Sequence, residues 1–439
     1  CLNQLSALAL STLFGKFSVC LPPESGGDLM LFHYLKFEFI KRNRRWWIWL
    51  LIAVLTGVGI FGNFQQQAAQ NEFVQKYRQA LIRQGANQAN RPETLTLELK
   101  KLNESPAVYN RWFSAELPVV SGKQPATKTN DGTAYRIAVL NGAAKLDYLE
   151  AVNRTVQQNE ILAQHKTTAY YPQGLLFTDQ ELQAMPDETE KLVREWFPTF
   201  YVRGFDYLQY LFQQNVPFYL LLIGIIVSGG FFAKELAHKR AHSNWLQLQG
   251  EGLVKQMMVQ FLTISLTLAE IVFLPLALTT LVTGLLRGFG SLEFPVLNNT
   301  YQDAFNSFSE AFTTRGQLLI RSVGLLLLLI ALVAAFNIAV ALISKNAWLT
   351  TSLVLLVVTS ALLIPPISWL PLSFFHVWGI ANGTIAQSVD LPGLQLGQGA
   401  LVIAIWSGIL LLVEVISSLN FVNWHPFRNS TKSGRVERV

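Results

Sequence analysis

Long apolar windows constrain this chain more than any other feature of its sequence. Several stretches of about 20 residues carry almost no charge, which is the length that an α-helix needs to cross a bilayer. Charged residues make up only 14% of the chain and apolar residues 51%, whereas a soluble domain is about 25% charged. The sequence therefore predicts an all-α integral membrane protein with several transmembrane helices.

Six apolar windows are expected to be transmembrane helices, and the last five of them would form a bundle over residues 216–419. Two adjacent prolines, Pro365 and Pro366, interrupt the fifth window near its end, because proline lacks the backbone donor that a helix interior needs. The six windows are 46–62, 216–233, about 258–286, 319–343, 347–370 and 400–419.

The distribution of lysine and arginine predicts which side each loop faces. Basic residues gather before the first window, around 234–257, at Lys345 and in the tail 420–439. Six spans place these four regions on one side, and the positive-inside rule makes that side the cytoplasm. We expect a multi-pass protein of the cytoplasmic membrane with both termini in the cytoplasm. Its net charge of +6 then reflects topology and contact with the lipid bilayer rather than nucleic acid.

Residues 63–215 are expected to form a large, mostly helical extracytoplasmic domain between the first two spans. Helical spacing of apolar residues predicts that the first span continues outward, and that 145–164 and 188–211 are helices. The segment 133–140, bounded by Asp-Gly and Asn-Gly, is expected to be a short strand. Beyond the fifth span, 365–399 is aromatic but punctuated, which predicts a re-entrant outer segment covered by protein or by a wet cavity.

The first 29 residues are interpreted as a leader or an artefactual extension, with Met30 as the native start. The alternative is that Cys1 is the mature end of a lipoprotein. Cys1 and Cys20 are the two cysteines of the chain, which excludes a disulfide scaffold and a sulfur-rich metal site.

Motifs for covalent chemistry, cofactors or metals are missing from the sequence. It contains no G-x-x-x-x-G-K-[ST] loop for ATP, no H-E-x-x-H and no G-x-S-x-G. His238 and His242 are four residues apart, but Lys239 and Arg240 between them oppose a divalent cation. We therefore expect no catalytic, cofactor or metal site in this chain.

Two carboxylates, Glu270 and Glu414, fall inside expected spans. A charged group within the bilayer is costly unless it faces a partner or water, so both are candidates for a functional role. The alternative is that each lies close enough to a span end to reach interfacial water.

The order of these segments resembles the permease subunits of export-type ATP-binding-cassette transporters, the bacterial type-two permease family. MLFHYLKFEFIKRNRR, residues 30–45, resembles the family's amphipathic elbow helix on the cytoplasmic face. An exterior insertion and the sequence FFAKELAHKRAHSNWLQLQGEGLVK follow, with Glu235 and Lys255 at the acidic and basic positions of the family pattern. The re-entrant segment is a further match. The resemblance covers roughly residues 30 to 425, but the family's proline after the cytoplasmic helix is missing from 247–252.

The resemblance implies that the chain forms half of a dimeric translocation path and performs no hydrolysis itself. A separate ATP-binding-cassette ATPase subunit would drive export, and a second permease subunit, identical or different, would complete the pore. The segment 234–257 would then be a cytoplasmic coupling segment, and its contacts with the ATPase are expected at Glu235, His238, His242, Trp245 and Leu246. Alternatively, the same segment is an interfacial helix with Lys239 and Arg240 at anionic lipid headgroups.

Two functions from other classes remain open at this stage. A proton-coupled secondary transporter would use Glu270 or Glu414 as a proton relay. An envelope ligand sensor without transport would bind its ligand through the isolated fragment 63–215. An intramembrane protease is disfavoured because no catalytic set is recognisable.

Overall fold

The computed structural model describes most of the chain between the first apolar window and the last. The described residues are 35, 36, 38, 46–87, 93–120, 149–178, 181–182, 185–236, 253–302 and 307–424. Of the expected elbow segment 30–45 it describes Leu35, Lys36 and Glu38, which are helical. The expected strand 133–140, the leader and the basic tail beyond Trp424 lie outside the described residues.

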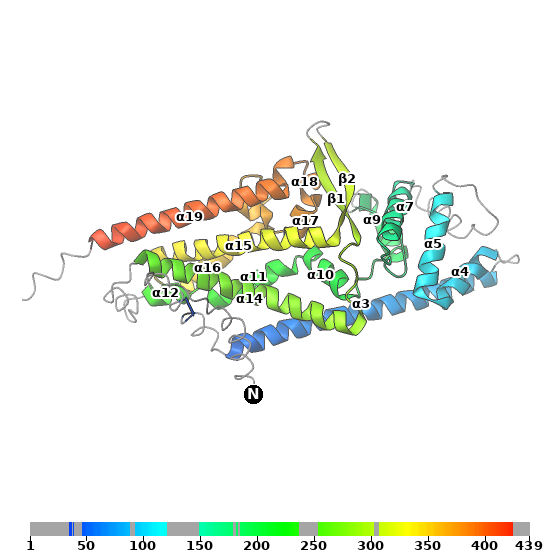
Figure 1. Cartoon of the computed structure of the whole chain (residues 1–439), viewed down its shortest axis with the longest axis horizontal. Coiled ribbons are helices and arrows are strands. Elements are labelled where there is room, and N and C mark those ends of the chain that lie inside the picture. The colour runs from blue at the N-terminus through cyan, green and yellow to red at the C-terminus, as the bar shows by residue number, and fades with distance from the viewer. Residues whose placement is uncertain are drawn as a thin grey trace, which may run out of the picture.

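Long helices that run along one axis form the body of the molecule (Figure 1). Five of the described helices are long and apolar enough to cross a membrane, which indicates a multi-pass membrane protein. A core of buried side chains between these helices is dominated by α11, α14 and α15. These helices are α3 (Trp46–Asn87), α11 (Val216–Ser228) with its continuation α12 (Phe231–Leu236), α14 (Leu253–Arg287), α15 (Arg315–Ser344) and α19 (Leu396–Trp424).

The fifth expected span is shorter than the sequence suggested. It consists of α16 (Ala347–Thr359) and one 3₁₀ turn, η2 (Ser360–Leu362), so this apolar helix is not among the five that are long enough to cross a membrane. The helix ends before Pro365 and Pro366, as expected from the clash between proline and the preceding turn.

Two glycines let α16 pack closely against the second span. Gly229 and Gly230 separate α11 from α12, and a Cβ atom added to Gly230 would lie 2.8 Å from the Cβ atom of Ala347. That distance is shorter than a carbon–carbon contact of about 3.5 Å, so the approach of the two helices depends on glycine.

The expected continuation of the first span is confirmed, because α3 has 42 residues and is about 63 Å long at 1.5 Å per residue. Its far half carries the insertion domain, which we define as the described residues between Glu93 and Arg203. The expected helix 145–164 is α7. The expected helix 188–211 is wrong as one element, since Pro198 lies in the break between α9 and α10. The helices that follow α3 are α4 (Glu93–Glu104), α5 (Pro106–Val120), α7 (Leu149–Gln164), α9 (Asp187–Trp196) and α10 (Gly204–Gln213).

The described chain is mostly helical, as expected for an all-α membrane protein, and it also contains one β-hairpin. Strands β1 (Pro295–Gln302) and β2 (Ser307–Thr314) pair antiparallel, with Pro295 opposite Thr314 and Gln302 opposite Ser307. The hairpin projects beside the insertion domain from the end of the bundle where α15 begins (Figure 1). Its strands are rich in threonine and aromatic residues, which favour a half-exposed pleated surface.

Residues 365–399 fold back as short helices that pack on the bundle. Phe374 and Trp378 are buried, and α17 lies against α15, so protein covers this segment as expected. Its entry into a membrane stays a prediction. Its elements are η3 (Pro371–Phe374), α17 (Val377–Ala381), α18 (Thr384–Ser388) and η4 (Pro392–Leu394).

The bundle therefore has two different ends. We call the end with the insertion domain, the hairpin and 365–399 the insertion end. The other end, where α12 stops, α14 starts and Lys345 joins α15 to α16, is called the loop end (Figure 1).

Candidate functional site

Glu235 is the one expected coupling residue that the structure describes, whereas His238, His242, Trp245 and Leu246 lie outside the described residues. Glu235 is the penultimate residue of α12, and its Oε2 atom accepts a hydrogen bond of 2.6 Å from Nε2 of Gln260 on α14. Gln260 is completely buried. This contact ties α12 to α14 at the residue before the last of α12.

Apolar packing also holds α12 in place. Phe231, Phe232 and Ala233 of α12 are buried, and α12 packs against α15 and α16. Helix α12 is thus fixed to three other helices immediately before residue 237, and α14 starts at Leu253. A displacement of α12 would therefore affect α14, α15 and α16 together.

The two carboxylates that were expected within spans lie on different helices. Glu270 is half-buried on α14. Glu414 on α19 is 2% exposed, and its Oε1 atom accepts no hydrogen bond from any residue that the structure describes. Because α19 continues to Trp424 and packs along α15, Glu414 is enclosed by helices rather than situated at the end of its own helix.

A cleft of about 650 Å³ opens at the insertion end, within the range of about 300–1,000 Å³ that is usual for ligand sites. Its walls come from four separate parts of the chain, which are the insertion domain, α10, strand β1 and the segment around α18. These walls include residues 169–178, 193–199, 209–214, 294–299 and 382–388, although not every residue in each range takes part.

The lining of this cleft is neutral and rich in hydrogen-bonding groups. Among the residues that line it, Arg194 carries the one permanent charge, and this side chain is 56% exposed and pairs with Glu190 at 2.7 Å. The remaining polar groups are amides, hydroxyls and one imidazole, interspersed with apolar and aromatic side chains. The rings of Tyr201 and Tyr210 stack at 5.4 Å between centroids.

A buried arginine, Arg315, lies behind the lining of this cleft, where it binds two of the lining residues. It is the first residue of α15 and is completely buried, and the Thr314 side chain caps the helix by accepting a hydrogen bond from the Gln317 backbone N–H. Its guanidinium forms a short ion pair with Asp206 and lies 4.5 Å from the ring centre of Phe294. It also donates to Gln209 Oε1 at 2.8 Å, to the Ser291 carbonyl at 2.9 Å and to the Tyr170 hydroxyl at 2.8 Å.

This network joins the insertion domain, α10, the loop before the hairpin and α15 at one point. Burial raises the pKa of the Tyr170 hydroxyl well above its ordinary value, against the opposing charge of Arg315. Tyr170 therefore keeps its proton at physiological pH and can accept from Arg315 while it donates to another group. Because Tyr170 and Gln209 line the cleft and bind Arg315, a shift of α15 would change the shape of the cleft.

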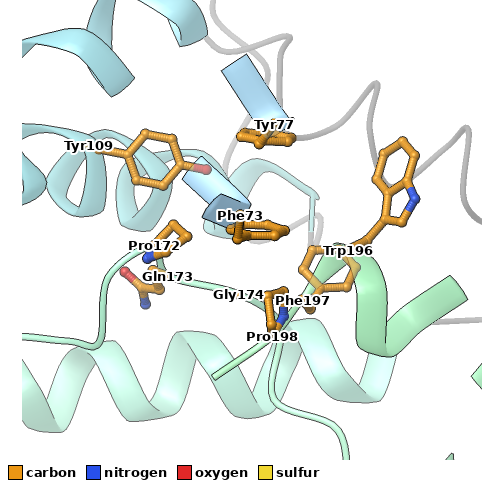
Figure 2. A pocket seen from close by; sticks show the side chains of 9 residues that line it. All are labelled: Phe73, Tyr77, Tyr109, Pro172, Gln173, Gly174, Trp196, Phe197 and Pro198. Carbon is orange, nitrogen blue, oxygen red and sulfur yellow. The ribbon is translucent and has the colours of Figure 1, made fainter. Parts of the chain in front are cut away.

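A second concavity, between α3 and α9, is a site of close side-chain packing rather than a ligand site. Figure 2 shows aromatic side chains converging there from several elements, and the space between them does not admit a water molecule. Phe73 stacks on Tyr77 at 5.8 Å and also contacts Phe200 at 5.7 Å. The packing of these rings holds the insertion domain against the long helix α3.

Sequence reasoning missed both the cleft and Arg315. The cleft is assembled from segments more than 200 residues apart, which no local pattern reveals. A signal for Arg315 did exist, because an arginine that opens a long apolar helix must find partners or reach water. Within the described part of the chain, no group of three or more His, Cys, Asp or Glu side chains could hold a metal ion. No protein-family model matches the sequence, and no curated protein or solved structure is significantly similar to it.

Proposed function

We propose that this chain is the permease subunit of an ATP-driven exporter in the cytoplasmic membrane. The segment 237–252 would contact a separate ATP-binding-cassette ATPase, and a second permease subunit would complete the translocation path. The loop end would face the cytoplasm, with six crossings that include the short α16.

The observation that carries this proposal is the anchoring of α12, which ends immediately before the segment 237–252. A contact that transmits force must be joined stiffly to the elements it moves. The Glu235–Gln260 hydrogen bond and the buried phenylalanines of α12 join this helix to α14, α15 and α16. A helix that merely lay on lipid headgroups would not need such an attachment.

Exposed apolar stripes on the outer helices are suited to lipid and to a second permease subunit. The spacing of three or four residues puts each stripe on one face of its helix. On α3 the stripe consists of Leu50, Val54, Val58 and Phe61, and on α19 it consists of Leu401, Ile405, Ile409, Leu412 and Ile416.

Photocrosslinking in intact cells tests the proposed contact. A benzophenone amino acid replaces Trp245 in one version of the full chain and Lys100, an exposed residue of the insertion domain, in the control. We expect position 245 to form an adduct with a soluble protein that carries G-x-x-x-x-G-K-[ST], and position 100 to form none. Adducts of position 245 with lipid alone would support the interfacial helix instead.

A proton-coupled secondary transporter is the second candidate, and Glu414 is the observation that favours it. A carboxyl group that is enclosed by helices and lacks a partner at Oε1 can take up and release a proton as the helices move. Transport that persists without ATP, stops when the proton gradient collapses and is lost in Glu414→Gln would establish this function. Loss of transport on ATP depletion with an intact gradient would exclude it.

A further inference from the structure

In the cleft at the insertion end, one edge of strand β1 has backbone groups that do not pair with another strand. The backbone N–H of Asn299 in β1 donates to the Asn382 carbonyl at 2.8 Å, and the Pro295 carbonyl accepts from Nε2 of Gln158 at 3.1 Å. Backbone groups of Asn299 and Pro295 thus point away from β2. In an antiparallel pair every second residue faces the same way, so Leu297 also directs its N–H and C=O outward.

Leu297 lies between these two occupied positions and lines the cleft. No hydrogen bond from another described residue uses its outward N–H or C=O. A donor and an acceptor side by side on a strand edge match the backbone of one residue in an extended chain, which is how peptides add to exposed sheet edges.

An unsatisfied acceptor next to Leu297 is a second, independent indication of a ligand. Asn299 is 5% exposed and lines the cleft, yet its Oδ1 atom has no hydrogen-bond partner among the described residues. A buried acceptor without a donor is destabilising, and an N–H group of a bound molecule would satisfy it.

The charge of the cleft restricts the ligand further. An ionised group moved from water into this lining would be desolvated without a counter-charge, because Arg194 is at the exposed rim and already pairs with Glu190. Apolar side chains such as Phe177, Phe197 and Ile385 offer contacts for uncharged apolar side chains of a ligand.

We propose that this cleft binds a short, uncharged peptide segment in an extended conformation, paired with the Leu297 backbone and with the Asn299 side chain. The site is composite, since β1 and the segment around α18 supply part of its wall. The isolated fragment 63–215 is therefore not expected to bind the peptide. Binding does not depend on the proposed ATPase, so either proposal can fail without the other.

Enrichment from a peptide library tests this site on the full chain in phosphatidylcholine–phosphatidylglycerol nanodiscs, without nucleotide. The library contains N-acetylated, C-amidated tetrapeptides of uncharged residues, and mass spectrometry identifies those retained. Isothermal titration calorimetry then gives the dissociation constant of the most enriched peptide, with the neutral trisaccharide maltotriose as the competing ligand class.

Two matched variants separate the backbone contact from side-chain effects. Leu297→Pro removes the cleft-facing N–H without removing a bond to β2, and Leu297→Ala shortens the side chain but keeps the N–H. We expect binding about tenfold weaker in Leu297→Pro than in Leu297→Ala. Asn299→Leu should weaken binding similarly, and Ser307→Ala, at an exposed position of the same hairpin, should not.

A ligand-side control keeps the test decisive if a variant fails to fold. N-methylation of single amides in the enriched peptide removes one donor at a time from the wild-type complex, and at least one position should weaken binding about tenfold. No enriched peptide, binding indifferent to every N-methylation, or binding of maltotriose instead of peptides would each overturn the proposal.

Discussion

Replacement of Arg315 by methionine tests the junction between the insertion domain and the bundle. The variant removes the partner of Asp206, a buried carboxylate, and withdraws the donors to Gln209 and Tyr170. Loss of one member of a buried ion pair typically costs about 3–5 kcal/mol, because the other charge is left unpaired. We therefore expect Arg315→Met to destabilise the insertion end by about 3–5 kcal/mol.

The double variant Arg315→Met with Asp206→Leu separates the unpaired charge from the lost packing. Removal of both charges often costs little, so the double variant should recover most of the stability lost in the single variant. Hydrogen exchange of α10 and β1, measured in nanodiscs, reports the local free energy of opening. The reasoning is refuted if α10 and β1 exchange at the wild-type rate in Arg315→Met. It is also refuted if the loss of stability in the double variant equals the sum of the losses in the two single variants.

Two further predictions concern packing and pH. Gly230→Val should lower the thermal unfolding temperature in detergent because its side chain meets α16, whereas Gly57→Val, with nothing within 4 Å, should leave that temperature nearly unchanged; equal effects would contradict the close approach. Burial opposes ionisation of Glu181, but hydrogen bonds from Arg154 and from the Thr178 backbone outweigh it and lower its pKa. This pair should therefore stabilise the insertion domain by about 1 kcal/mol above about pH 4.3 and lose that effect as pH falls further. Hydrogen exchange of α7, compared at pH 6 and pH 3.5, should show the loss of stability at the lower pH. If Glu181→Gln loses as much stability as the wild type between these pH values, the ion pair is not its cause.

The helical body was largely predictable from the sequence because its signal is local. A window of apolar residues long enough to cross a bilayer must be helical in lipid. The helical spacing of Phe73 and Tyr77 predicted that α3 continues past the first apolar window. A local signal also gave one wrong length. Apolar content alone predicted that the fifth window, which contains Pro365, forms a span as long as the others.

The site was less predictable because it depends on distant pairings. The strands of the hairpin are half-exposed, so polar residues such as Asn298 and Ser309 interrupt any apolar alternation. The Arg315 network needs Asp206, which is 109 residues earlier in the chain, and no spacing rule connects them. Glu235 was recognised through a resemblance, whereas its hydrogen bond to Gln260 could be seen only in three dimensions.

The most direct test of the central claim is co-purification of the full chain from its native membrane in mild detergent. We predict that a soluble subunit carrying G-x-x-x-x-G-K-[ST] accompanies the wild-type chain and the control Lys234→Ala, which alters an exposed residue of α12. The same subunit should be lost from Glu235→Lys combined with Trp245→Ala, while that variant remains folded. An intact wild-type chain that purifies without any such ATPase would contradict the account and direct attention to Glu414.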